Sequence, residues 1–146
     1  MYRKILLCYD GTIEGRRALR QGAEVAIAMH SEAYLLAISR SLLATSVPEG
    51  VTPELVASDE RDAKSLLADG VQWLKDHDVV TEGSLVYGDP LEQIPQVAER
   101  IGADLIVVGH RYRSRLARWW SESEEATLLT RISCSILVAM AVPEGK

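Results

Sequence analysis

The sequence contains no phenylalanine, and aromatic residues make up only 5% of its 146 positions, although 47% of the residues are hydrophobic. A core must therefore be filled by leucine, isoleucine, valine and alanine, which suits helices packed closely on a β-sheet. One domain of this length buries roughly two thirds of the surface that its unfolded chain exposes. We therefore expect a single domain over residues 1–146 that needs neither metal nor disulfide to hold it.

Cysteine is also scarce, and the two cysteines, Cys8 and Cys134, lie beside apolar runs outside any CxxC or Cys/His pattern. Buried, reduced thiols and a cytoplasmic location are expected. The sequence has no basic segment ahead of a signal-like apolar core, and no apolar stretch approaches the ~20 residues of a membrane span. We therefore expect a mature chain that begins at or near Met1 and makes no membrane contact.

Acidic residues are missing from residues 110–120, which carry Arg111, Arg113, Arg115 and Arg118. The net charge of the whole chain is −5, so the rest of the chain carries −9. An acidic body argues against general nucleic-acid binding, whereas a local basic patch favours one confined anionic contact.

Apolar runs and helical periodicity alternate along the whole chain. Buried strands are predicted at residues 5–9, 33–38, 79–87, 104–109 and 135–142, and helices at residues 14–30, 53–76, 89–101 and 122–132. Runs without apolar–polar alternation are typical of strands that are buried on both faces. Strands separated by helix-length segments require right-handed crossovers and a parallel sheet.

The third predicted helix has a start signal and a stop signal. Asp89 is a suitable N-cap, Pro90 fits the first helical position, Glu92 stands three residues after the cap, and Gly102 ends the helix. Pro95 conflicts with this pattern, because an interior proline loses a hydrogen bond and clashes with the carbonyl four residues earlier. A kink or a delayed start is expected there.

Two residues mark the edge of the sheet where a ligand would bind. Asp10 ends the first predicted strand and Gly109 ends the fourth, and Thr12 lies near the N-cap of the first helix. In parallel sheets, ligands bind beyond the carboxyl ends of the strands, at the point where the strand order reverses. The loop from Gly109 to Ser123 is therefore predicted to belong to the functional end of the molecule.

Collinear pieces of the chain carry a resemblance to a known family. These pieces are residues 5–12 with the alanine-rich helix after them, Gly88-Asp89-Pro90, residues 103–109, and Cys134 followed by the last strand. In this order the chain resembles the universal stress protein family. The resemblance implies an α/β fold of the adenine-nucleotide alpha hydrolase-like type, with a five-stranded parallel sheet of order 3-2-1-4-5 and helices on both faces.

The resemblance also implies a glycine motif in the nucleotide-binding members: a glycine, two residues, a glycine, nine residues, then Gly-Ser or Gly-Thr. On this sequence the motif falls on Gly109, Tyr112, Glu122 and Ser123. Tyr112 would change the path of the loop or block a phosphate cradle, since glycine allows positive φ and close backbone approach. Glu122 places a carboxylate where backbone N–H groups would receive phosphate.

The arginines of the same loop leave two interpretations open. Arg111 and its neighbours could offset the repulsion by binding phosphate bidentately. Alternatively, the loop arginines pair with Glu122, Glu124 and Glu125, or they contact a protein partner. Surface charge runs are often only solvated, which favours internal pairing or a protein contact over residues 110–121.

Other candidate residues have both a functional and a structural interpretation. Asp10 matches the family's first-strand aspartate, which in nucleotide-binding members reaches the ribose or base, but it could equally cap a helix or form a turn. Trp119 and Trp120 could stack on a base or, more typically, take part in an interface. The last strand, with Ile136 and Val138, is an unprotected apolar edge in the implied order, which favours a homodimer through this strand.

Two classes of function follow from these residues. The first is a non-enzymatic, dimeric stress-response or signalling protein without ATP turnover and without a required cofactor. The alternative is an ATP- or AMP-binding member of the family that uses Asp10, Gly109, Ser123 and loop arginines such as Arg111. A signal receiver domain is excluded because no lysine lies at the end of the fifth strand, and no Ser/His/Asp or Cys/His constellation supports a hydrolase.

Overall fold

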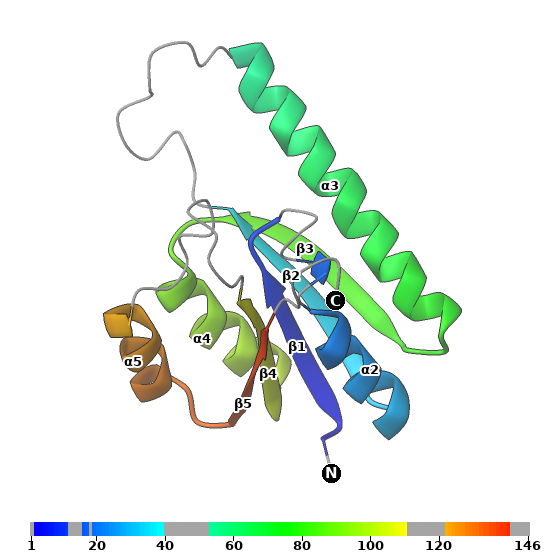
Figure 1. Cartoon of the computed structure of the whole chain (residues 1–146), viewed down its shortest axis with the longest axis vertical. Coiled ribbons are helices and arrows are strands. Elements are labelled where there is room, and N and C mark those ends of the chain that lie inside the picture. The colour runs from blue at the N-terminus through cyan, green and yellow to red at the C-terminus, as the bar shows by residue number, and fades with distance from the viewer. Residues whose placement is uncertain (1, 12–15, 18, 40–52, 111–121, 141–146) are drawn as a thin grey trace.

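The computed structural model describes residues 2–11, 16–17, 19–39, 53–110 and 122–140. Helices cover both faces of a central sheet, with α2 and α3 on one side and α4 and α5 on the other (Figure 1). The strands are β1 (Lys4–Tyr9), β2 (Glu32–Ser39), β3 (Thr81–Tyr87), β4 (Leu105–His110) and β5 (Ser135–Met140), and the helices are α2 (Arg20–Met29), α3 (Pro53–Asp76), α4 (Pro90–Ile101) and α5 (Glu122–Arg131).

The sheet has five strands in the order β3-β2-β1-β4-β5, and every pair is parallel. This confirms the predicted order and class. The chain returns to the middle of the sheet after β3, so β1 and β4 are neighbours although they lie far apart in the sequence, as the pair Ile5 and Leu105 shows. The strand order therefore reverses between β1 and β4, which is where the ligand site of such a sheet is expected.

The central strands are apolar at successive positions because both of their faces are covered. In β1, Leu7 and Tyr9 face α2 and α3, whereas Leu6 and Cys8 face α4 and α5. All four are buried. The absence of phenylalanine is accommodated as expected, because branched aliphatic side chains fill most of both layers.

Helix α4 begins and ends where its sequence signals predicted. The Asp89 carboxylate accepts a hydrogen bond from the Leu91 N–H at 2.9 Å, and Gly102 ends the helix with φ +71°. The helix start is not delayed by Pro95, which lies inside the helix. Pro95 deprives the Leu91 carbonyl of its helical donor, and Arg131 Nη1 donates to that carbonyl instead at 3.2 Å. The guanidinium thereby links α5 to α4.

The first predicted helix is interrupted in the structure: Arg16 and Arg17 are helical, and α2 follows after Leu19. Helix α2 begins at Arg20, with no side-chain hydrogen bond at its N-cap position, Leu19, and it ends where His30 adopts a left-handed conformation. Leu19 lies in a turn, and its N–H donates to the carbonyl of the helical residue Arg16 at 3.1 Å. Thr12, the predicted cap, lies outside the described residues. Helix α3 has the predicted bounds.

The cysteines are unpaired. Cys8 is buried as predicted, whereas Cys134 is half-buried. Burial raises the pKa of the Cys8 thiol far above its ordinary value, which keeps it protonated and unreactive. In the part of the chain that the structure describes, no helix is long and apolar enough to cross a membrane.

Candidate functional site

The carboxyl ends of β1 and β4 bring two of the predicted site residues to one edge of the sheet. Cys8 pairs with Val108 across the two strands, so Asp10 and Gly109 follow that pair at the same edge. Both are half-buried. The prediction that these two residues lie together at the reversal of the strand order is therefore supported by the register.

The chain leaves β1 through a tight turn at Gly11. This residue has φ +83°, a left-handed conformation that side chains rarely adopt. A Cβ at this position would meet only Ala63 Cβ, at 4.0 Å. Glycine is thus required by the backbone conformation and not by crowding.

Helix α5 contains the last two positions of the family's glycine motif, although this chain has no glycine there. Glu122 and Ser123 lie in its first turn, as predicted, together with Glu124 and Glu125. The first turn of α5 is therefore rich in acidic residues. The other candidate residues of the preceding loop, Arg111, Tyr112, Trp119 and Trp120, lie outside the described residues, and so do the predicted ion pairs of the loop arginines.

Two pieces of the family resemblance lie away from the β1–β4 edge. Gly88 and Asp89 follow β3, an outer strand, where the Gly88 N–H donates to the Ser39 carbonyl at 3.0 Å. Asp104 stands at the opposite end of the sheet, where its carboxylate accepts the backbone N–H groups of Arg3 at 2.8 Å and Lys4 at 3.1 Å. Asp104 therefore ties β4 to the start of β1 and has a structural role.

The outer strand β5 exposes apolar side chains on both of its faces. Leu137 is 38% exposed and Val138 is 45% exposed, and successive residues of a strand point to opposite faces. Ile136 is half-buried against the α4–α5 side of the sheet. The prediction that β5 is an apolar edge is confirmed by the strand order and by these exposures.

The structure also shows a cavity that the sequence did not reveal. It lies between α2 and α3, has a volume of about 420 Å³, and is lined by three arginines, Arg16, Arg17 and Arg20, together with Asp69 and several apolar residues. The available signal was a run of arginines around the start of a helix whose first turn has no acid. Neither Asp10 nor Gly109 lines this cavity.

Metal binding receives no support from the described residues. Across the described ranges, no three His, Cys, Asp or Glu side chains gather closely enough to hold a metal ion.

The fold and the β1–β4 edge define a class: a doubly wound, Rossmann-like α/β domain whose ligands bind beyond the strand ends. The sequence profile of the universal stress protein family matches residues 1–139, so the chain belongs to the universal stress protein family.

Individual relatives are distant in sequence and similar in length. The universal stress protein YxiE of Bacillus subtilis is 24% identical, over 94% of this chain and 99% of its own. The structure of UspA from Lactobacillus plantarum superposes with a TM-score of 0.70 at 18% identity, covering 94% of this chain and 97% of that one. A family protein from Arabidopsis thaliana, solved with AMP bound, gives a TM-score of 0.66 at 18% identity, covering 98% and 97%.

Proposed function

We propose that the chain is a non-enzymatic, dimeric stress-response or signalling protein that pairs with a second copy through β5. The observation that carries this proposal is the exposure of Leu137 and Val138 on opposite faces of an outer strand. A strand that is apolar on both faces is typical of the interior of a parallel sheet, where helices cover both sides. In this chain such a strand lies at the edge.

An edge strand of this kind can be protected by a copy of itself. A two-fold axis beside β5 would pair the strand with its symmetry mate, satisfy the outer backbone groups and cover both exposed side chains. The resemblance to the family also implies that two chains pair edge to edge. The exposures of Leu137 and Val138 are the evidence from this chain itself.

The proposed absence of ATP turnover rests on the first turn of α5. Glu122, Glu124 and Glu125 lie at the positive end of that helix. Carboxylates stabilise this end when no ligand is bound, and they repel the phosphates of a nucleotide. Release of phosphate from Mg-ATP should therefore not exceed the rate in buffer, as measured by a coupled phosphate assay.

Light scattering of the purified protein tests the dimer. We expect the mass of two chains at micromolar concentration. The Val138→Lys substitution puts a lysine from each chain into the proposed apolar contact, so the dimer dissociation constant should rise by about 100-fold. Val80→Lys is the matched control, because Val80 is 70% exposed ahead of the opposite edge strand and should leave the mass unchanged. A wild-type monomer at micromolar concentration would contradict the proposal.

A second candidate function is binding of an adenine nucleotide of the AMP type at the β1–β4 edge. The observation that favours it is the placement of Asp10 and Gly109 at the reversal of the strand order. The family protein that was solved with AMP has the same fold. In this interpretation Asp10 binds the ribose or base, and Ser123, Arg111 and other loop arginines bind the phosphate.

Isothermal titration calorimetry with AMP and with Mg-ATP separates the two candidates. If the site binds nucleotide, Asp10→Asn should weaken AMP at least about tenfold, since a hydrogen bond to a charged group contributes about 1.5–3 kcal/mol. Glu122→Gly should strengthen Mg-ATP more than AMP, because it removes a charge beside the phosphates. No heat at millimolar nucleotide, with the dimer intact, would leave only the first candidate.

A further inference from the structure

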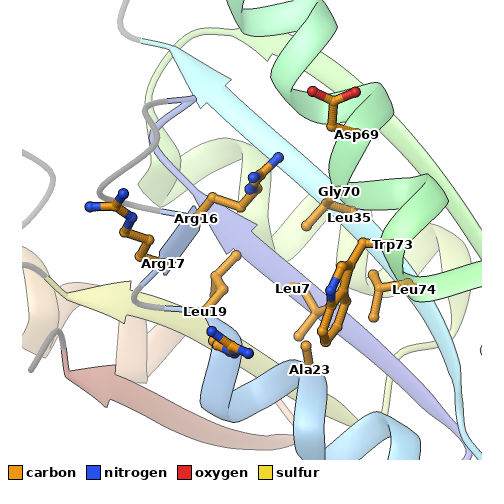
Figure 2. Close-up of a pocket in the computed structure, with 11 residues that line it drawn as sticks. Leu7, Arg16, Arg17, Leu19, Ala23, Leu35, Asp69, Gly70, Trp73 and Leu74 are labelled. Atoms are coloured by element: carbon orange, nitrogen blue, oxygen red, sulfur yellow. The ribbon is translucent and has the colours of Figure 1, made fainter. Parts of the chain in front are cut away.

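Helix α3 has a hollow on each of two sides, and the two hollows differ in what they expose. The inner hollow, toward α2, is floored by Leu7, Leu35 and Leu74, which are at most 3% exposed (Figure 2). On the outer side, a groove of about 770 Å³ lies between α3 and β3. The outer groove presents surface that a partner can contact, because it is lined by exposed residues: Lys64, Ala68, Gln72, Lys75, Glu82 and Gly83.

Strand β3 forms one edge of the sheet, and its backbone hydrogen bonds show which residues face outward (Figure 1). Just before the strand, the Val80 carbonyl accepts from the Ala33 N–H at 2.9 Å. Just after it, the Gly88 N–H donates to the Ser39 carbonyl at 3.0 Å. The register with β2 is continuous between these points, and backbone groups of a strand point alternately to its two sides. The even-numbered residues therefore face β2, and the outward N–H and C=O groups are those of Thr81, Gly83, Leu85 and Tyr87.

The middle of this edge exposes backbone itself. Gly83 is exposed, and a glycine has only backbone atoms to expose. Its lack of a side chain is required by packing, since a Cβ would lie 2.7 Å from Val71 Cγ2 of α3. Leu85 is half-buried and Tyr87 is 44% exposed. A glycine within a strand often marks a place where another backbone approaches closely, and at Gly83 that approach is open.

The sequence of β3 gives this edge little protection against pairing. Its seven residues contain one charged residue, Glu82, and neither lysine nor proline. Edge strands are commonly protected by such residues. Whereas β5 exposes apolar side chains, the centre of β3 exposes hydrogen-bonding groups. A partner here would be held mainly by main-chain hydrogen bonds, as in the addition of a peptide strand to a sheet edge.

The wall that α3 forms beside β3 leaves room for side chains of an added strand. Ala68 is exposed and carries only a methyl group, and it lines the groove together with Gly83. Val71 and Leu85 line the same groove and are half-buried. Every second side chain of an added strand would point to this side of the sheet. A branched aliphatic side chain such as valine fits between the small residues and the partly exposed apolar ones.

Charge favours an acidic side chain at one end of the groove. Lys75 is exposed in the last turn of α3, the helix that leads into β3. Lys64, toward the other end, already pairs with Glu60 at 3.0 Å. Glu82 also lines the groove, but it neighbours Gly83 on the strand and therefore belongs to the opposite face of the sheet. An acid on the α3 side near the start of β3 is thus closest to Lys75.

We propose that the groove between α3 and β3 binds an extended peptide segment of a partner protein, which adds to β3 as an antiparallel strand. Its backbone pairs with Gly83 and Leu85, a valine-like side chain lies beside Ala68, and an acidic side chain at its carboxyl end lies near Lys75. Antiparallel pairing is slightly more stable per residue than parallel pairing, and antiparallel edge strands are common on parallel sheets. A second copy fits less well, because a two-fold pair through β3 would bring both α3 helices over one joint.

This surface lies at the opposite edge from β5 and does not depend on the function proposed above. Its test uses the hexapeptide acetyl-Thr-Val-Thr-Val-Thr-Asp-amide, whose valines and aspartate share one face when it is extended. Calorimetry gives the affinity, and amide chemical shifts of the labelled protein give the location. We expect shift changes at Gly83 and Leu85, with Leu137 and Val138 unchanged.

N-methylated peptides test the backbone pairing without changing the protein. In an antiparallel pair, the N–H groups of the residues that face α3 point toward β3. Methylation of both valine nitrogens should therefore weaken binding at least about tenfold, since two hydrogen bonds are lost. Methylation of the second and third threonine nitrogens, which point away from β3, should change the affinity less than about threefold.

Two variants test the protein side. Leu85→Pro removes an outward N–H and leaves the hydrogen bonds to β2 in place, so it should weaken the hexapeptide at least about fivefold. Lys75→Gln should weaken it about threefold, and should leave the peptide with Asn in place of Asp unchanged. Arg20→Gln is the matched control, because it removes one exposed positive charge outside this groove and should have no effect.

Three results would overturn the proposal. One is the absence of heat and of shift changes at millimolar hexapeptide. Another is an equal effect of the two methylation patterns, which would show that the peptide does not pair as a strand. The third is a set of shift changes centred on Leu137 and Val138, which would place the peptide at β5. The methylated peptides decide the matter even if Leu85→Pro, checked by circular dichroism, does not fold.

Discussion

The two helical layers contact the sheet in different ways. On the α4–α5 face, Ile94, Val97 and Leu128 fill the space between helices and strands and are at most 3% exposed. On the α2–α3 face the core side chains are equally buried, but the closest contacts of the helices with their strands are made at glycines, Gly22 on Val107 and Gly70 on Leu35. Hollows of about 420 Å³ lie beside both layers, so the difference between the faces lies in the helix contacts.

The same comparison applies to charge. On the α4–α5 face, the contact of Arg131 with the Leu91 carbonyl joins the two helices. On the α2–α3 face, Arg16 reaches the Leu66 carbonyl of α3. Arginines thus bridge helices to their neighbours on both faces of the sheet.

The largest expected effect comes from deleting a core side chain on the α4–α5 face. Ile94→Ala deletes a fully buried side chain between α4 and the sheet and should lower the free energy of unfolding by about 3 kcal/mol. Urea unfolding measures this change. Val80→Ala, at a position that is 70% exposed, should stay within about 0.5 kcal/mol of wild type. A loss below about 1 kcal/mol for Ile94→Ala would show that this face is not closely packed.

The close contact of α2 with β4 at Gly22 gives a smaller effect on the free energy of unfolding. Gly22→Ala favours the helix by about 1 kcal/mol, but its Cβ overlaps the Val107 side chain. Forcing a side chain into a packed contact typically costs about 1–3 kcal/mol, so we expect a net loss of about 1 kcal/mol in urea unfolding. In a Val107→Ala background the same substitution should become stabilising. No difference between the two backgrounds would mean that α2 is not seated on Val107.

Tyr9 makes the α2–α3 face sensitive to alkaline pH. Burial raises the pKa of Tyr9 to about 12; the nearby Arg16 charge opposes this rise and the Asp10 carboxylate adds to it. The unfolded state ionises near pH 10. Stability from the neutral phenol is therefore complete below about pH 10 and is lost as the pH rises toward about 12.

Tyr9→Phe tests this dependence and removes the unpaired hydroxyl. Between pH 8 and pH 11, wild type should lose about 1.4 kcal/mol more of its unfolding free energy than the variant. Urea unfolding at the two pH values measures the difference, and the comparison with Tyr9→Phe cancels other alkaline effects such as that of Cys8. Equal losses in both proteins would contradict the burial of a neutral phenol.

The smallest effect concerns the link between α4 and α5. Arg131→Gln removes the donor to the Leu91 carbonyl and should cost about 0.5–1 kcal/mol. In a Pro95→Ala background the cost should fall toward zero, since an alanine at this position restores the helical N–H. A double-mutant cycle by thermal unfolding measures the coupling. Additive effects would show that Arg131 does not substitute for the missing donor.

The sequence predicted the fold well because local signals and periodicity agreed with the tertiary structure. Asp89, Pro90 and Gly102 set the bounds of α4 through backbone chemistry that acts within one turn. The unalternating apolar run of β1 predicted a strand covered on both faces. The sequence did not predict the interruption at Leu19, because the turn between the helical residues Arg16 and Arg17 and the start of α2 keeps the helical periodicity.

The candidate site could be predicted only in part. Asp10 and Gly109 were placed together, since the strand order alone brings β1 beside β4. Asp104 belonged to a recognisable piece of the family pattern, yet its hydrogen bonds to Arg3 and Lys4 at the other end of the sheet depend on tertiary structure. The α2–α3 cavity depends on helix spacing, which is set by glycine contacts between distant segments and has no local sequence signal.

The most direct test of the proposed function is the mass of the purified wild-type protein, measured by light scattering at micromolar concentration. We expect the mass of two chains, because Leu137 and Val138 leave both faces of the edge strand β5 exposed. The mass of one chain would contradict a dimer through β5.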